Sequence, residues 1–164
     1  MEARLFYEET LVRLHVLADS DEDEAQRVKL CVVRAIRQKA ARVAARARSA
    51  QEAFDRLTRA RGRLRRAAAR EARRQGFRGP VAVETGVFDF PDRVYGAQLV
   101  PAGQYRAVRV KVGSARGRNW WCVLYPQLCA VEESCARALT SPEAVHFYSS
   151  VGRFLQDLLR GVGL

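Results

Sequence analysis

The spacing of apolar residues changes twice along this chain, from alternation to helical spacing and back again. Residues 11–18 alternate, residues 20–76 place apolar side chains three and four apart, and residues 81–125 alternate between turn-forming stretches. Alternation is typical of half-buried strands, and the longer spacing is typical of amphipathic helices. Because the helical stretch separates one strand from all the others, the sequence predicts an α+β fold.

The predicted sheet is mostly antiparallel and has about four strands, near residues 11–18, 81–87, 105–113 and 119–125. In the first strand, Arg13 and His15 alternate with apolar residues and are expected on the solvent side. Residues 113–117 are predicted to form a hairpin loop that joins the last two strands. The 164 residues are enough to bury one core, so we expect a single domain, 1–164.

Two long helices, from about residue 20 to 48 and from 49 to 75, are expected to cover one face of the sheet. Ser20 is the expected N-cap of the first helix, and the acidic residues 19–24 favour the positive end of its dipole. Ser49 and Glu52 form a capping-box pattern that starts the second helix, and Gly62 permits a break within it. A C-terminal helix is expected over residues 140–162.

The net charge of +11 is concentrated in the predicted helices. Residues 34–74 contain 15 basic and three acidic residues, a local net charge of +12, so the rest of the chain sums to −1. The same segment is crowded with alanine, a pairing typical of a solvated helical face in an Arg- and Ala-rich proteome. The alternative is a polyanion-binding surface, which would make the protein a nucleic-acid-binding module.

The four cysteines do not have the spacing of metal ligands, and the two histidines lie far from them in sequence. Cys122, His15 and Asp89 could be drawn as a nucleophile, a base and an orienting group, but no nucleophile elbow supports that set. No phosphate-binding glycine loop or paired-carboxylate motif is present in the sequence. We therefore expect no enzyme activity, no cofactor and no metal.

Residues 113–126 hold adjacent tryptophans, Trp120 and Trp121, among arginine and asparagine residues. Neighbouring residues on a strand point to opposite faces, so one ring is expected in the core and the other toward solvent or a partner. Tryptophan beside arginine has the composition of an interaction hot spot. The alternative is that both rings are covered within the protein.

No apolar run reaches the length needed to cross a bilayer, and no signal peptide is visible in the first 14 residues. From the residues alone, the protein is either cytosolic or made with a leader outside this sequence.

Four stretches resemble the stage II sporulation protein R family. They are Arg13–Ser20 with Gln26; Phe88–Pro91 with Tyr95–Gly96; Pro101–Gly103 with Tyr105, Ala107 and Arg109–Val110; and Gly117 with Asn119–Val123, Pro126 and Leu128–Cys129. Together they make 11–129 the family-like core. The ordered set is specific, because Asn-Trp-Trp-Cys-Val after Phe-Asp-Phe-Pro and Pro-Ala-Gly rarely arises by chance.

The resemblance implies a signalling protein without an enzymatic site. Members of the family are made in the forespore and exported into the space between the two cell membranes. There they activate a membrane-embedded aspartyl protease of the mother cell, which removes the pro-segment of an early sigma factor. Nucleic acid is not the favoured partner, and proximity to a membrane surface is implied.

The expected receptor surface comprises the segment 88–95 and the loop 116–121, both with aromatic residues beside charged or amide groups. Its residues are Asp89, Phe90, Tyr95, Arg116, Arg118, Asn119, Trp120 and Trp121. In the oxidising space that the resemblance implies, Cys122 is expected to form a disulfide with Cys129 or Cys135. Cys31 is expected to stay reduced and buried.

Overall fold

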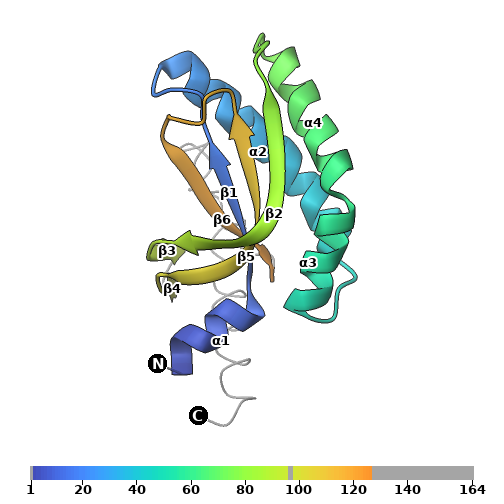
Figure 1. Cartoon of the computed structure of the whole chain (residues 1–164), viewed down its shortest axis with the longest axis vertical. Helices are drawn as coiled ribbons and strands as arrows, with labels where there is room; N and C mark the ends of the chain where they lie inside the picture. Colours follow the sequence, from blue (N-terminus) through green and yellow to red (C-terminus); the bar gives the residue numbers. More distant parts are fainter. Residues whose placement is uncertain (1, 96–97, 127–164) are drawn as a thin grey trace, which may run out of the picture.

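The computed structural model describes residues 2–95 and 98–126 and shows a four-stranded sheet with a layer of helices on one face (Figure 1). The α+β class is therefore confirmed. The elements follow in the order α1 (Glu2–Thr10), β1 (Val12–Leu17), α2 (Asp23–Ala44), α3 (Ala50–Arg59), α4 (Arg61–Arg74), β2 (Val81–Phe90), β3 (Arg93–Tyr95), β4 (Gln98–Val100), β5 (Gly103–Val112) and β6 (Asn119–Tyr125). The predicted C-terminal helix lies outside the described residues.

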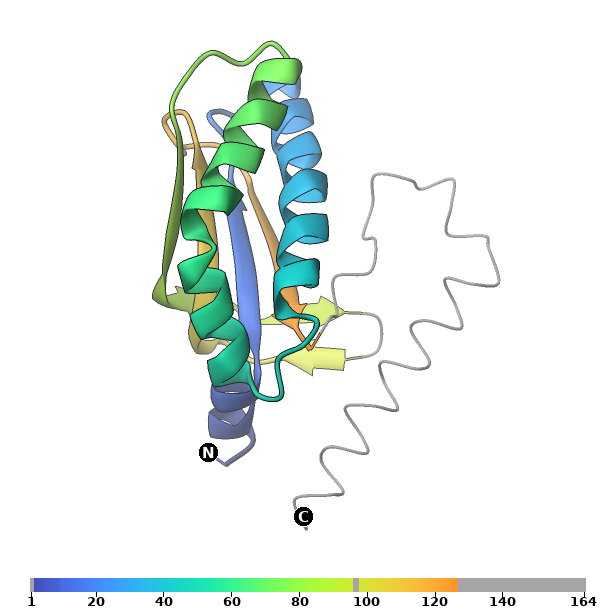
Figure 2. The same ribbon diagram turned by 90° about the vertical axis from the view of Figure 1, so that its right-hand side faces the viewer.

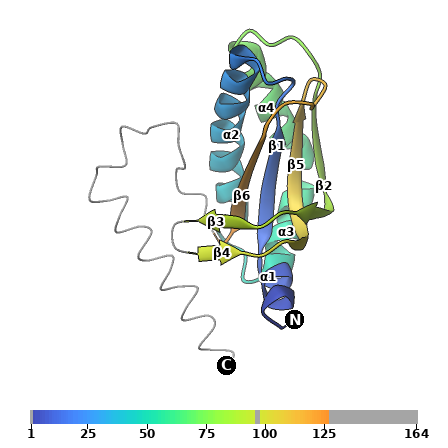
Figure 3. The same cartoon turned by 90° about the vertical axis from the view of Figure 1, so that its left-hand side faces the viewer.

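The sheet has the order β2-β5-β1-β6, which places the first strand of the chain at its centre (Figure 3). β1 runs parallel to β5 and antiparallel to β6, and β2 runs antiparallel to β5. The predicted hairpin between β5 and β6 is therefore wrong, because β1 lies between them. Residues 113–118 instead cross the end of β1, a long-range arrangement that no local pattern encodes.

The central place of β1 buries both of its faces. Val12, Leu14 and Val16 lie in the core beneath the helices, as alternation predicts. Arg13 and His15 are also buried, with 0% and 7% of their surface exposed, so the expectation that they face solvent is wrong. The opposite sheet face has a small core of its own, which includes Tyr7 of α1. No sequence pattern indicated α1.

The helical layer packs on one sheet face through residues spaced three and four apart (Figure 2). α3 and α4 follow one another with a break at Ala60, close to the Gly62 that favoured one. Ser49 caps α3, since its hydroxyl accepts a hydrogen bond from the Glu52 amide at 3.1 Å. Full burial of a leucine such as Leu57 or Leu64 stabilises the fold by about 2 kcal/mol. α2, α3 and α4 thus form the helical layer expected on one face of the sheet.

The acidic turn after β1 has the predicted role only in part, since Asp23 and Glu24 lie in the first turn of α2 as expected. α2 begins at Asp23, and its N-cap is Glu22 without a side-chain cap, so Ser20 is not the N-cap. Instead the Asp19 and Asp21 carboxylates accept hydrogen bonds from the backbone amides of Ser114 and Arg118. These bonds hold the 113–118 crossing against the end of β1.

Two further features hold residues 113–118 close to the end of β1 and to α2. A Cβ atom on Gly117 would overlap the carbonyl oxygen of Ser20, so only glycine permits this approach. Lys29 of α2 is buried and donates hydrogen bonds to Gln26 at 2.7 Å and to the Arg118 carbonyl at 3.1 Å. Burial lowers the pKa of the Lys29 ammonium. The crossing is therefore bound to both β1 and α2.

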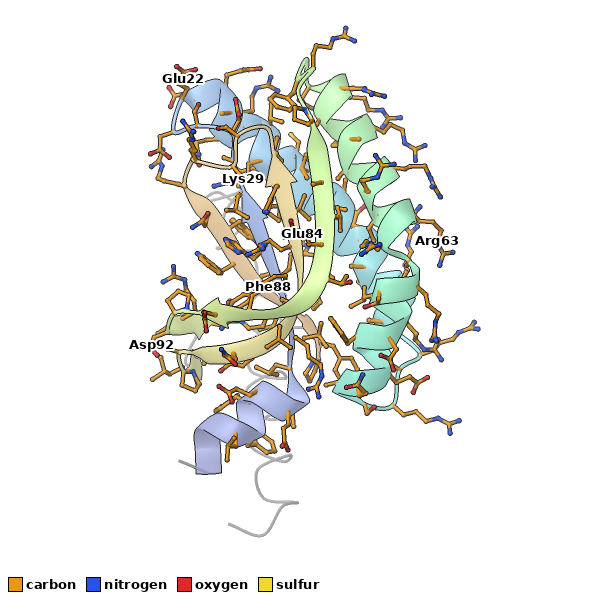
Figure 4. All side chains as sticks on the ribbon, in the orientation of Figure 1. Glu22, Lys29, Arg63, Glu84, Phe88 and Asp92 are labelled. Atoms are coloured by element: carbon orange, nitrogen blue, oxygen red, sulfur yellow. The ribbon has the colours of Figure 1, made fainter. Side chains whose placement is uncertain are left out.

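β2 extends beyond the predicted residue 87 and includes Phe88, Asp89 and Phe90. The stretch after it contains the short hairpin of β3 and β4. At the base of this hairpin the Asp92 carboxylate accepts a hydrogen bond from the Ala102 amide (Figure 4). Figure 3 shows the hairpin crossing the sheet face that the helices leave uncovered.

Candidate partner-binding site on the second sheet face

The buried guanidinium of Arg13 is the centre of an arginine–aromatic cluster, formed by Arg13, His15, Phe90, Tyr95, Tyr105 and Trp121. Its carbon lies 4.3 Å from the ring centre of Phe90 and 4.8 Å from that of Tyr105. One nitrogen donates a hydrogen bond to the Tyr95 hydroxyl at 2.9 Å. The other two nitrogens are buried without a hydrogen bond, and none of the described carboxylates pairs with this charge. A buried cation held by aromatic rings and one hydroxyl group, without a carboxylate partner among the described residues, is costly for stability.

His15 lies next to Arg13 on the same face and stacks on Trp121, with ring centres 3.7 Å apart and planes 11° from parallel. Burial lowers the pKa of the His15 imidazole to about 4, while the Asn119 side chain acts in the opposite direction. The nearby charges of Arg109 and Arg13 lower it further. His15 is therefore neutral at physiological pH and serves as a flat stacking surface.

Trp121 connects this cluster to the molecular surface. Its ring meets Phe90 edge to face, with centres 5.0 Å apart, and the exposed Arg93 lies over it at 5.5 Å. On the neighbouring hairpin, Val94 and Leu99 face each other across the strands and are 59% and 53% exposed. An exposed apolar pair beside a half-buried tryptophan and an arginine has the composition of a protein-binding surface.

A charged group continues the same sheet face toward β2. The Glu84 carboxylate accepts hydrogen bonds from Lys111 at 2.7 Å and from Arg109 at 2.6 Å (Figure 4). These partners hold the pKa of the Glu84 carboxyl below its usual range, the Lys111 bond contributing most. The Arg109 guanidinium also lies 3.9 Å over the ring of Phe88. This face is thus charged and aromatic rather than an ordinary apolar core.

The structure divides the predicted receptor residues between two places. Phe90, Tyr95 and Trp121 meet in the cluster. Phe90 is only 2% exposed, so it supports the site from within and does not contact a partner as expected. Asp89 is exposed and accepts a hydrogen bond from Gln104 at 3.3 Å.

Arg116 and Arg118 lie in the crossing at the far end of β1, away from the β3–β4 hairpin (Figure 1). Asn119 begins β6 beside Leu17, between the crossing and the cluster.

Trp120 points to the helical side of the sheet, as expected for the neighbour of Trp121. It is half-buried against the main core, and its indole nitrogen is buried without a hydrogen bond among the described residues. Cys122 is buried and disulfide-bonded, with a partner outside the described residues. Cys31 is a free cysteine, but it is half-buried rather than buried as expected.

The geometry does not assemble a catalytic set from the residues considered in the sequence. Cys122 belongs to the core under the helices, whereas His15 lies in the cluster on the other face. Among the described residues no group of three or more His, Cys, Asp or Glu side chains is placed to hold a metal ion. No helix in the described part of the chain is long and apolar enough to span a membrane.

Arg13, His15, Tyr105 and Arg93 were not among the predicted contact residues. The sequence did contain a signal for Arg13 and His15. If their strand lies inside the sheet, both side chains are buried on its second face and need partners on that face. Whether β1 is central depends on the crossing of residues 113–118, which looked like a local hairpin. The same resemblance stretches, however, contain the rest of the cluster. Phe90, Tyr95 and Tyr105 lie against Arg13, and His15 and Trp121 lie against Phe90.

The protein is therefore an α+β domain whose second sheet face presents charged and aromatic side chains beside an exposed apolar pair. Comparison with known protein families matches residues 8–135 to stage II sporulation protein R. The chain belongs to this family. Stage II sporulation protein R of Bacillus subtilis strain 168 is 32% identical over 133 residues, which is 80% of this chain and 59% of that protein. The chain thus spans about three fifths of that relative's length. No solved structure matches it significantly.

Proposed function

We propose that this protein is an extracytoplasmic sporulation signal that activates a membrane-embedded aspartyl protease of the mother cell. The protease in turn processes an early pro-sigma factor. Family membership supports a role in sporulation, and the family signal acts through a protein partner. The single observation that carries the proposal is the convergence of the resemblance stretches on the Arg13 cluster, beneath an exposed rim.

The proposed contact surface is that rim: the β3–β4 hairpin with Arg93 and Val94, and the exposed edge of Trp121. Arg93 and Val94 reach solvent and take no part in the buried core of the described residues. They are therefore available to a partner, while His15 and Phe90 hold Trp121 in place beneath them. Such a rigid, supported aromatic residue loses little entropy on binding.

Co-expression with the candidate protease and its pro-sigma substrate tests the proposal, with cleavage of the substrate as the readout. Arg93→Ala and Val94→Asp should lower cleavage at least about tenfold with unchanged thermal stability, since both side chains are exposed. Arg118→Ala and Asp89→Ala test the remaining predicted contacts in the same assay. Absence of cleavage with the unaltered chain, when a known active relative gives cleavage, would contradict the proposed function.

The alternative, a nucleic-acid-binding module, required arginine helices and a stacking tryptophan on one surface. Trp121 lies on the sheet face opposite the helices, and Trp120 is packed against the core. Figure 4 shows Arg63 of α4 pointing away from the sheet. The geometry therefore favours the protein-binding function. Tight, steeply salt-dependent binding to DNA or RNA would reverse that preference.

A further inference from the structure

The outer edge of β2 is a long sheet edge that has no proline, no lysine and no bulge, and no element among the described residues covers it. β2 is the terminal strand of the sheet, and Figures 2 and 3 show no described element beside its outer edge. Alternate residues of an edge strand direct their N–H and C=O groups away from the sheet, where they can pair with another chain. Natural edges are usually short, bulged, proline-containing or guarded by lysine.

β2 has ten residues and contains no proline, lysine or arginine. Its pairing with β5 runs from Val81 to Phe90 without a register shift, so no bulge turns the edge away. It has two charged side chains, and both are drawn inward toward β5. Glu84 is held by Arg109 and Lys111, and Asp89 accepts from Gln104. Val87 is 59% exposed, so an apolar side chain lies where a guard residue would be expected.

The charge beside this edge indicates which kind of segment fits it. α4 lies against β2 and carries seven arginines and one glutamate, a net charge of +6. Most of these arginines are exposed, and Arg74 is the one that pairs with Glu71. A strand added to β2 would therefore lie beside a strongly positive helix, which attracts acidic residues.

The same charge argues against a second copy of this chain as the occupant. Two copies whose β2 edges pair antiparallel, about a two-fold axis perpendicular to the sheet, would place their helical layers on the same side. The two α4 helices, each with a net charge of +6, would then lie nearest the junction. Their repulsion disfavours this dimer.

We propose that the β2 edge binds an extended acidic segment of a partner protein, which adds a fifth strand to the sheet. Backbone hydrogen bonds would supply most of the affinity, contact with Val87 would add apolar burial, and α4 would select for negative charge. This inference goes beyond the proposed function, because it concerns a different surface and does not depend on the identity of the partner.

Amide hydrogen exchange on the full chain tests the inference with two synthetic peptides of the length of β2. One alternates valine and glutamate, and the other alternates valine and lysine. In the free protein, alternate β2 amides should exchange quickly, while their neighbours bonded to β5 are protected. At millimolar concentration the glutamate peptide should slow the fast set at least about tenfold, and the lysine peptide should leave it unchanged.

Matched variants at one exposed position separate charge from fold. Val87→Glu should abolish protection by the glutamate peptide, whereas Val87→Lys should retain it, and both should fold because the side chain is largely exposed. Leu5→Glu, at an exposed position on α1, is the control and should bind as the parent does. Uniform protection of β2 in the free protein would overturn the inference, since another part of the chain would then occupy the edge. Equal effects of the two peptides, or no effect of either, would overturn it too.

Discussion

At the residue scale, the protein buries a cation and a neutral histidine side by side in an aromatic setting. Arg13 has rings where an arginine in a core commonly has a carboxylate, and His15 is stacked rather than solvated. Burial of the Arg13 charge lowers the free energy of unfolding, and burial of His15 lowers it at acidic pH, so both effects can be measured. The stacked His15 also holds Trp121 in its position.

His15 should make stability depend on pH. Its pKa is about 4 in the folded protein and near 6.5 when unfolded, so the unfolded chain binds the proton more readily. The contribution is fully present above about pH 6.5 and is lost as pH falls toward 4. Between pH 7.5 and 5 we expect a loss of about 2 kcal/mol in the free energy of unfolding, measured with urea. His15→Gln is the control: an equal loss in that variant would assign the effect to other groups.

Replacement of Arg13 should separate the effect of its charge on stability from the effect of its side-chain volume. Arg13→Met keeps the length of the side chain and removes a buried charge, so its free energy of unfolding should equal or exceed that of the parent, by up to about 2 kcal/mol. Arg13→Ala leaves a cavity and should cost about 3 kcal/mol. Denaturant unfolding measures both. A strongly destabilised methionine variant would show that the charge itself holds Phe90 and Tyr105 together.

At the element scale, α3 and α4 show a division between a buried alanine–leucine stripe and an exposed arginine face. Leu57, Ala60, Leu64 and Ala68 are fully buried. The arginines on the other side extend into solvent, and most have no acidic partner among the described residues. The buried alanine and leucine residues thus hold α3 and α4 on the sheet, and the arginine side chains face solvent or a partner.

Exchange of Arg59, Arg63, Arg66, Arg70 and Arg73 for glutamine should leave the fold and signalling intact, because all five are exposed and glutamine is a comparable helix former. Circular dichroism and the cleavage assay measure the outcome. Leu64→Ala in the same helix is the contrasting variant and should lose about 3 kcal/mol. Lost signalling with intact helicity would show that the charge contacts the partner or an anionic lipid surface.

At the scale of the whole molecule, the sheet depends on a crossing of the chain over its own first strand. Residues 113–118 pass the end of β1 and place β6 on its far side, held by Asp19, Asp21 and Lys29. Cys122 then lies in β6 next to Leu14, beneath the helices. A disulfide at this position joins the tryptophan strand to the chain that follows.

We predict that Cys122 pairs with Cys129 or Cys135 in protein made in an oxidising compartment. Non-reducing peptide mapping identifies the pair, and Cys31 should be alkylated as a free thiol. The closed loop is short, so reduction should lower stability by about 2–3 kcal/mol and leave the sheet folded. Cleanly alkylated Cys122, Cys129 and Cys135 in that material would refute the pairing.

Local pattern determined much of this protein: the α+β class, the approximate strands, the Ser49 cap and the buried stripe of α3 and α4. These follow from side-chain spacing and from hydrogen bonds between near neighbours, which a short stretch of sequence contains. The same patterns could not place β1 between β5 and β6, because strand order depends on pairing between residues far apart in the chain.

That order buries Arg13 and His15, and it places the carboxylates of Asp19 and Asp21 against the backbone amides of the crossing. The site shows the same division. Sequence reasoning identified Tyr95 and Trp121, which belong to distinctive motifs, but Arg13, at the centre of the cluster, looked like an ordinary solvent-facing residue. A side chain's environment depends on which strands flank its own, and in this protein only the tertiary structure decided that.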